Sequence, residues 1–115
     1  MSSLEGKVRS VLVLQPRGGD ATALVDFFRR NDVLGLAVRH AGCWSSELHV
    51  PLSGTGPVVV TAVWDDAAAY EGWRNHPVRA TFTADMERLV DLEASPVIGS
   101  GVYAVAVCAS RPGER

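Results

Sequence analysis

The chain has 115 residues, of which 47% are hydrophobic and 21% charged, and its formal net charge is −2. This length suits a single domain over residues 1–115, with an ordered core from about residue 7 to 109. The near-neutral charge offers no attraction for nucleic acid or an anionic membrane, and no apolar run is long enough to span a bilayer. Residues 1–6 lack the charged and apolar regions of a secretory signal, so we expect a cytoplasmic protein.

Eight segments alternate between strand and helix patterns. In order they are a strand over Val8–Gln15, a helix that begins at Asp20, a second helical turn over Val33–His40, a strand over Cys43–Leu52, a strand over Val58–Trp64, a short helix from about Asp66 to Arg74, a longer helix from Pro77 to about Leu92, and a strand over Gly101–Ala109. This β-α-β-β-α-β order, with each helix divided in two, predicts an α+β ferredoxin-like fold with an antiparallel sheet.

Two of the helices have clear apolar faces. In the first, Leu24, Phe27 and Phe28 share one side. The stripe of the longer helix consists of Val78, Phe82, Met86 and Leu89 or Val90. Both faces predict packing against the sheet.

The strands Val58–Trp64 and Val102–Cys108 are apolar on both faces. In a β-α-β-β-α-β unit both helical segments cover the same face of the sheet, so the other face needs a different cover. We therefore expect a homodimer in which two copies pack sheet to sheet. His49, on the strand face opposite Trp44, is expected near that interface.

The cysteines and histidines are too sparse for a metal site. Cys43 and Cys108 lie far apart, and no Cys-x-x-Cys or His-x-x-x-His spacing occurs. The two cysteines are typical of small buried hydrophobic residues in a reducing compartment, with a disulfide as the alternative.

Aromatic side chains concentrate in the stretch from residue 64 to 77. Trp64 ends a buried strand, Tyr70 and Trp73 lie three residues apart on a short helix, and His76 precedes a proline. Large rings with polar tips, gathered where a strand meets two helices, are typical of a concave small-molecule site.

From about Val8 to Val107 the chain resembles the antibiotic biosynthesis monooxygenase family of the dimeric α+β barrel superfamily. The motifs that carry the resemblance are Gly42-Cys43-Trp44 before Glu47-Leu48, Val63-Trp64-Asp65-Asp66, Ala69-Tyr70, Trp73 and His76-Pro77. The resemblance implies a dimeric α+β barrel. It also implies one of several activities: oxidation of aromatic polyketides by dioxygen without metal or flavin, haem degradation, quinol oxidation, or cyclisation and isomerisation.

Three positions separate this chain from the best-defined branches of that family. The haem-degrading branch carries an axial His where this chain has Thr83, and a strand Asn near Val11, which speaks against haem. The anthrone-oxidising branch carries an Asn where this chain has Val60, although its Trp and Tyr match Trp64 and Tyr70. The resemblance therefore implies a site that works without a cofactor.

The expected site combines this resemblance with the aromatic pattern. The catalytic candidates are Trp64, Tyr70 and His76, with the imidazole as a base. A helix N-cap is the alternative role for His76, and a core role is the alternative for the rings. The expected substrate contacts are Trp73, Phe28, Phe82, Met86 and Trp44. Arg74 and Arg79 could stabilise a phenolate, with solvated surface positions as their alternative.

The sequence favours a cofactor-independent monooxygenase that oxidises a polyphenolic or aromatic polyketide-type substrate with dioxygen in secondary-metabolite biosynthesis. In such an enzyme the ionised substrate itself reduces dioxygen, and the protein orients the ring, stabilises the anion and excludes water. Two alternatives stay open. One is a cofactor-free cyclase or isomerase of a poly-β-keto intermediate on the same fold. The other is a non-catalytic, small-ligand-binding dimeric protein.

Overall fold

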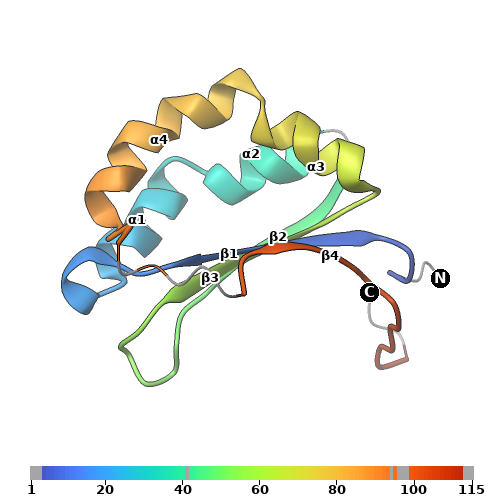
Figure 1. Ribbon diagram of the computed structural model, residues 1–115, viewed down its shortest axis with the longest axis horizontal. Coiled ribbons are helices and arrows are strands. Elements are labelled where there is room, and N and C mark those ends of the chain that lie inside the picture. Colours follow the sequence, from blue (N-terminus) through green and yellow to red (C-terminus); the bar gives the residue numbers. More distant parts are fainter. Residues whose placement is uncertain (1–3, 41, 94, 96–98, 113–115) are drawn as a thin grey trace.

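A four-stranded antiparallel sheet carries the α-helices on one of its faces (Figure 1). The structure, a computed structural model, describes residues 4–40, 42–93, 95 and 99–112. In chain order the elements are β1 Val8–Leu14, the 3₁₀ turn η1 Arg17–Gly19, α1 Thr22–Arg30, α2 Val33–Arg39, β2 Cys43–His49, β3 Val58–Trp64, α3 Ala67–Arg74, α4 Pro77–Leu89 and β4 Gly101–Ala104. The strand order β2-β3-β1-β4 confirms the predicted ferredoxin-like α+β fold.

Local side-chain hydrogen bonds set where the helices begin. Asp20 lies one residue before the N-cap of α1, and its carboxylate accepts from the Thr22 N–H at 2.9 Å. Asp66 caps α3 by accepting from the Ala69 N–H at 2.8 Å. His76 caps α4, with Pro77 at the start of the helix as expected.

Three elements end three or more residues earlier than the sequence predicts. The β2 strand ends at His49 rather than Leu52, and Pro51 has no N–H to donate to a ladder. The α4 helix ends at Leu89, where the Arg17 guanidinium binds the backbone carbonyls of residues 87, 88 and 90. The β4 strand ends at Ala104, which pairs with Val8 at the start of β1; beyond this pair Val105 still exchanges backbone hydrogen bonds with Gly6 and Lys7.

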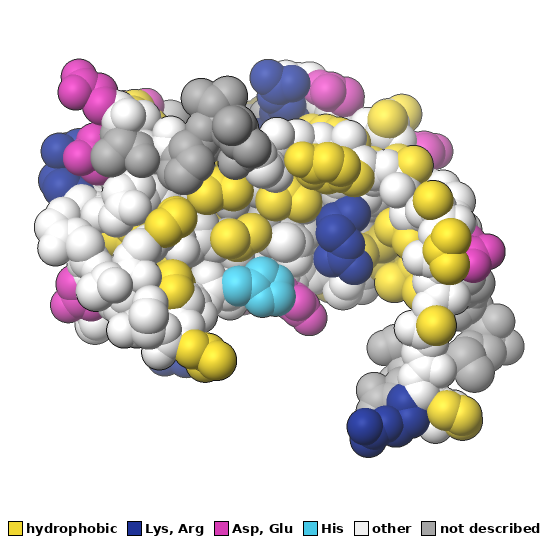
Figure 2. All heavy atoms as spheres, turned by 60° about the horizontal axis from the view of Figure 1, so that its bottom comes forward, with side chains coloured by type: hydrophobic (Ala, Val, Ile, Leu, Met, Phe, Trp, Pro, Cys, Tyr) yellow, Lys and Arg dark blue, Asp and Glu magenta, His cyan; other side chains and the backbone are white. Residues whose placement is uncertain are grey.

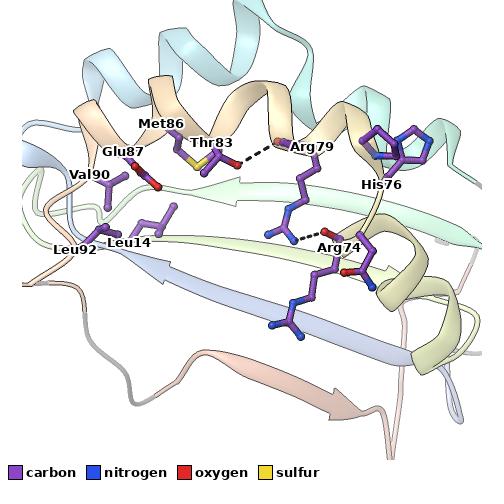
Figure 3. A pocket seen from close by; sticks show the side chains of 12 residues that line it. Leu14, Arg74, His76, Arg79, Thr83, Met86, Glu87, Val90 and Leu92 are labelled. Carbon is purple, nitrogen blue, oxygen red and sulfur yellow. Dashed lines mark hydrogen bonds between the residues drawn. The ribbon is translucent and has the colours of Figure 1, made fainter.

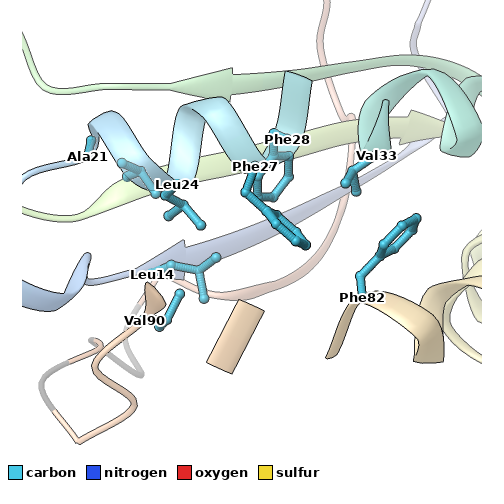
Figure 4. Packing of buried hydrophobic residues seen from close by; sticks show 9 residues of the cluster. Leu14, Ala21, Leu24, Phe27, Phe28, Val33, Phe82 and Val90 are labelled. Carbon is cyan, nitrogen blue, oxygen red and sulfur yellow. The ribbon is translucent and has the colours of Figure 1, made fainter. Parts of the chain in front are cut away.

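The main core lies between the sheet and the helices α1 and α4 (Figure 4). Phe27 packs edge-on against Phe28 and Phe82, with ring centroids 6.2 Å and 6.3 Å apart. This first cluster consists of Leu14, Ala21, Leu24, Phe27, Phe28, Val33, Val58, Phe82 and Val90. It contains the whole predicted face of α1 and, from the predicted stripe of the longer helix, Phe82 and Val90; the other stripe residues, Val78, Met86 and Leu89, are partly buried and pack against it.

A second, smaller buried cluster lies toward α2 and α3. It consists of Ala37, Ala62, Trp64 and Trp73. It combines two large indole rings with two alanines, whereas the first cluster contains three phenylalanines.

The opposite face of the sheet carries no helix in the part of the chain that the structure describes (Figure 1). By strand alternation and register, Val11 and Val13 of β1 and Val59, Thr61 and Val63 of β3 point to this bare face. Figure 2 shows hydrophobic side chains scattered over it, with a histidine beside an acidic side chain among them. None of the helices described has the length and apolarity that a bilayer crossing requires.

Candidate functional site

An inner cavity of about 90 Å³ lies between the sheet and the helices. Six of the eight predicted site residues line it: Phe28, Trp64, Tyr70, Trp73, Phe82 and Met86. All four members of the second cluster belong to its wall. The fold therefore gathers side chains from β3, α1, α3 and α4 around one space.

Trp64 is the most deeply buried of these rings, with 1% of its surface exposed. It ends β3 on the face that points to the helices. Its indole Nε1 donates to the Ser10 hydroxyl on the neighbouring strand at 3.0 Å. The ring of Tyr70 meets it edge-on, with centroids 5.7 Å apart. The Ser10 bond fixes the orientation of the indole and satisfies its only donor.

Tyr70 and Trp73 both reach the cavity from one side of α3. Trp73 is buried, whereas Tyr70 keeps partial exposure. Among the described residues the Tyr70 hydroxyl has no hydrogen-bond partner, so it is available to an oxygen atom of a ligand. Trp73 also contacts the rings of His40 and His76, with centroids 5.9 Å and 6.1 Å away.

A larger outer cavity of about 380 Å³ opens between α4 and the sheet (Figure 3). Its apolar side chains come from β1, α4 and the segment that follows α4: Leu14, Met86, Val90 and Leu92. Arg74, His76 and Arg79 supply its polar end, and Glu87 also lines it. Arg79 and Met86 line both cavities, so their side chains stand at the shared wall.

His76 faces the outer cavity and is not part of the inner cavity's wall. Its Nδ1 accepts the backbone N–H of Val78 at 3.1 Å, which caps α4. This bond leaves Nε2 as the ring nitrogen free to meet a ligand. The N-cap role weighed for His76 is therefore present in the structure.

Trp44 lies away from both cavities, in a surface group with Lys7 and Asp65. Its indole N–H donates to the Asp65 carboxylate, and the Lys7 ammonium lies 4.8 Å from the ring centroid. The cause is an irregularity in β2, where Cys43 pairs with Trp64 but Ser45 already pairs with Val63. Trp44 is left without a partner in the ladder and turns outward.

The inner cavity also has polar residues that the sequence did not single out. Ser10 and Ser46 lie on β1 and β2 at positions that face the helices. The sequence could have indicated Ser10 as a cavity residue, because a serine at this helix-facing position interrupts a run of apolar side chains in the strand. Arg79 was expected either to stabilise a phenolate or to lie at the solvated surface, and the structure places it in the lining of both cavities.

Ionisable groups are sparse in the inner wall. Tyr70 and Arg79 are the only titratable side chains among its described lining residues. Nearby, burial raises the pKa of the Cys43 thiol above its ordinary value. Both cysteines are free, and within the described ranges no group of three or more His, Cys, Asp or Glu side chains could hold a metal ion.

Comparison with known proteins points to one family. The family model described as antibiotic biosynthesis monooxygenase matches residues 8–85. SnoaB from Streptomyces nogalater, described as a cofactor-independent oxygenase, shares 17% identity over 95% of this chain and 99% of its own, with a TM-score of 0.68. Rv0793 from Mycobacterium tuberculosis shares 18% identity over 90% of this chain and 97% of its own, with a TM-score of 0.64.

A third solved structure, PA3566 from Pseudomonas aeruginosa, shares 18% identity over 94% of this chain and 100% of its own, with a TM-score of 0.65. At these identities the structures establish the shared fold. A search of curated proteins gave no match.

Proposed function

Because the chain belongs to the antibiotic biosynthesis monooxygenase family, we propose that it is a cofactor-independent monooxygenase acting on a polyphenolic or aromatic polyketide-type substrate. The observation that carries this proposal is the lining of the inner cavity, where aromatic rings surround a space with few ionisable groups. The likeness to SnoaB, a cofactor-independent oxygenase, supports the same chemistry. Secondary-metabolite biosynthesis is the setting that the family's description suggests.

The lining suits a reaction that the substrate itself drives. An electron-rich ring packs favourably against the faces and edges of Trp64, Trp73 and Phe82. Once ionised, such a ring can pass electrons to dioxygen directly. Conversion of a ring CH₂ to a carbonyl consumes one dioxygen and releases one water, so no other reductant is required. The protein then has to orient the ring, stabilise the anion and keep bulk water out.

The sizes of the two cavities determine how a substrate can lie. The inner cavity, at about 90 Å³, is smaller than the cavity of roughly 150 Å³ that holds benzene in an engineered protein. The outer cavity, at about 380 Å³, falls within the usual range for ligand sites. We therefore propose that a polycyclic substrate lies mainly in the outer cavity and extends past Arg79 and Met86 at the shared wall toward the inner cavity.

Each predicted residue receives a proposed role on this basis. The free hydroxyl of Tyr70 donates to a substrate oxygen, and Trp64, held by Ser10, forms the back of the pocket. Trp73, Phe28, Phe82 and Met86 contact the ring. His76 faces the substrate from the outer cavity as a donor rather than as the expected base, because its Nδ1 accepts the cap N–H and the neutral ring then carries its proton on Nε2. Trp44 is left out of the proposed site because of its surface position.

Oxygen uptake tests the proposal. With 1,8-dihydroxyanthrone, the wild-type protein should consume dioxygen faster than buffer alone and form the anthraquinone. Tyr70→Phe should lower kcat by about tenfold or more, as expected when a hydrogen bond to a developing anion is lost. Tyr103→Phe is the matched control, because Tyr103 lies on the edge strand β4 in register with Val63 of the bare face, lines neither cavity, and its hydroxyl donates to the Gly99 carbonyl. Full turnover without dioxygen would overturn the proposal.

One observation favours a second candidate, a non-catalytic ligand-binding protein. The inner wall offers only Tyr70 and Arg79 as titratable groups, which is a small set for acid–base chemistry. Saturable binding of hydroxyanthrones with no turnover would support it. The cyclase or isomerase alternative is separated by product mass, because only the oxygenase adds an oxygen atom from dioxygen, whereas an isomerase keeps the mass and a cyclase changes it only by loss of water.

We also propose that two copies pack through the bare face of the sheet. Its valines are apolar, and His49 adds a polar group there, 3.2 Å from both Glu47 and Thr61. Light scattering should give twice the 12.3 kDa monomer mass. Val59→Lys on this face should yield the monomer, whereas Val38→Lys on α2, where the valine is already exposed, should not. A monomeric wild-type protein would contradict this arrangement.

A further inference from the structure

Arg79 occupies a position where a cation is locally unfavourable. It lies in the first turn of α4, close to the positive end of the helix dipole, and that turn has no acidic residue. Among the described residues, no carboxylate lies within ion-pair distance of its guanidinium. Its one side-chain hydrogen bond goes to the Arg74 carbonyl, at a long 3.5 Å. Most of its five N–H donors are therefore unused.

Arg74 brings a second guanidinium to the same cavity. It extends from the end of α3, and Figure 3 shows both guanidinium groups reaching from the helices toward the sheet. Its ion pair with Glu71 spans 3.6 Å between two largely exposed side chains. Such surface pairs are weak and are exchanged readily for a better partner. The outer cavity thus has two available cations at one end.

The rest of the outer cavity is unlike this cationic end. Leu14, Met86 and Val90 give it an apolar lining, and Glu87 lies two helical turns beyond Arg79 along α4. Glu87 repels a negative group from that part of the cavity, so an anionic ligand is oriented with its charge toward the two arginines.

We propose that the site takes an aromatic carboxylate, whose carboxylate group is bound by Arg79 and Arg74 in the outer cavity. The planar guanidinium matches a carboxylate through two parallel hydrogen bonds, and both arginines can contribute. The ring continues past Met86 toward the inner cavity, and only this placement of the ring rests on the proposed function. Arg79, which lines both cavities, is the specificity-determining residue.

Paired probes of matched shape test the proposal. Anthraquinone-2-carboxylate and the neutral anthraquinone-2-carboxamide should both quench the fluorescence of Trp64 and Trp73. The wild-type protein should bind the carboxylate about tenfold more tightly, as expected for a charge-assisted hydrogen bond. Arg79→Gln should abolish this preference, because it should lower the affinity for the carboxylate about tenfold more than the affinity for the carboxamide. Arg74→Gln should reduce it less.

The control is Arg88→Gln, on the same helix, because Arg88 pairs with Asp85 and lines neither cavity. Should Arg79→Gln fail to fold by circular dichroism, Arg79→Lys keeps the charge without the planar fork and should keep only part of the preference. Equal affinity of the wild-type protein for both probes, or equal loss of both in Arg79→Gln, overturns the proposal. Binding is measured without dioxygen, so a failed oxygenase assay and a failed anion preference are separate results.

Discussion

The two buried clusters of this molecule use different side chains and achieve different results. In the first, Phe27 packs edge-on between Phe28 and Phe82, and neither Phe27 nor Leu24 lines either cavity. The second combines Trp64 and Trp73 with two alanines, and every member lines the inner cavity. Phe28, Val33 and Phe82 of the first cluster line that cavity as well. The inner cavity therefore lies where the two clusters meet, and the first cluster contributes a filled part around Leu24 and Phe27.

The largest effect on stability is expected from truncating a side chain of the first cluster. Leu24→Ala should lower the free energy of unfolding by about 3 kcal/mol, because it opens a new cavity where no space exists. Leu24 is 1% exposed and lines neither cavity, so ring binding should survive. Urea unfolding measures the loss. Leu52→Ala is the control, since Leu52 is fully exposed and its removal should leave stability within about 0.5 kcal/mol. A similar loss in both variants would contradict the role assigned to the first cluster.

The next largest effect is expected at the contact between Gly42 and α3, beside the second cluster. Gly42 has φ +89°, and a Cβ at this position would lie 2.6 Å from the Cβ of Ala69 on α3. Gly42→Ala should cost about 2 kcal/mol, since backbone strain and a clash with α3 add together. It should also weaken ligand quenching, because α3 carries Tyr70 and Trp73.

Gly54→Ala separates the two causes of that loss. Gly54 has nearly the same backbone angle, φ +85°, but nothing lies within 4 Å of its added Cβ. It should cost about 1 kcal/mol, from strain alone, with no effect on binding. Equal costs for the two glycines would mean that the approach of α3 to Gly42 is unimportant.

A smaller effect is expected from the hydrogen bond that orients Trp64. Ser10→Ala removes the acceptor at 3.0 Å from the indole nitrogen and should cost about 1 kcal/mol. Thermal or urea unfolding measures it, and ligand affinity should fall as the indole loses its fixed orientation. In a Trp64→Phe background the same serine change should cost almost nothing, because no donor remains. An unchanged cost in that background would assign the effect of Ser10 to packing.

The bounds of several strands and helices could be predicted from the sequence, because they are determined by residues close together in the chain. The strand Val58–Trp64 was predicted with the bounds that the structure has, and the start of α4 at Pro77 followed from the fixed backbone of proline. The aromatic spacing of Tyr70 and Trp73 on one helix likewise predicted that they share a face. Such patterns depend on neighbours within a few residues.

The features that the sequence could not predict depend on distant partners. The outward turn of Trp44 follows from a register shift between β2 and β3, which no pattern within β2 reveals. Arg79 was expected either at the solvated surface or near a phenolate, and its place at the wall of two cavities depends on how α4 crosses the sheet. The bounds of β4 depend on its pairing with β1, whose first residue, Val8, is the partner of Ala104.

The smallest effect is expected from the thiol of Cys43, which packs against the second cluster. Burial raises the pKa of Cys43, so the folded protein holds the thiol proton more tightly than the unfolded chain does. The stabilisation that the protonated Cys43 thiol contributes is therefore complete below the ordinary thiol pKa. It is lost as the pH rises through the higher pKa of the folded protein. Alkylation of Cys43 by iodoacetamide, followed by peptide mass spectrometry, should be slower in the folded protein than in urea at about pH 8. Cys43→Ala should remove the small alkaline decline in stability. Equal alkylation rates in the folded and unfolded protein would mean that the Cys43 thiol is open to solvent. The edge of the second cluster would then be accessible to water, unlike the buried Leu24 of the first cluster.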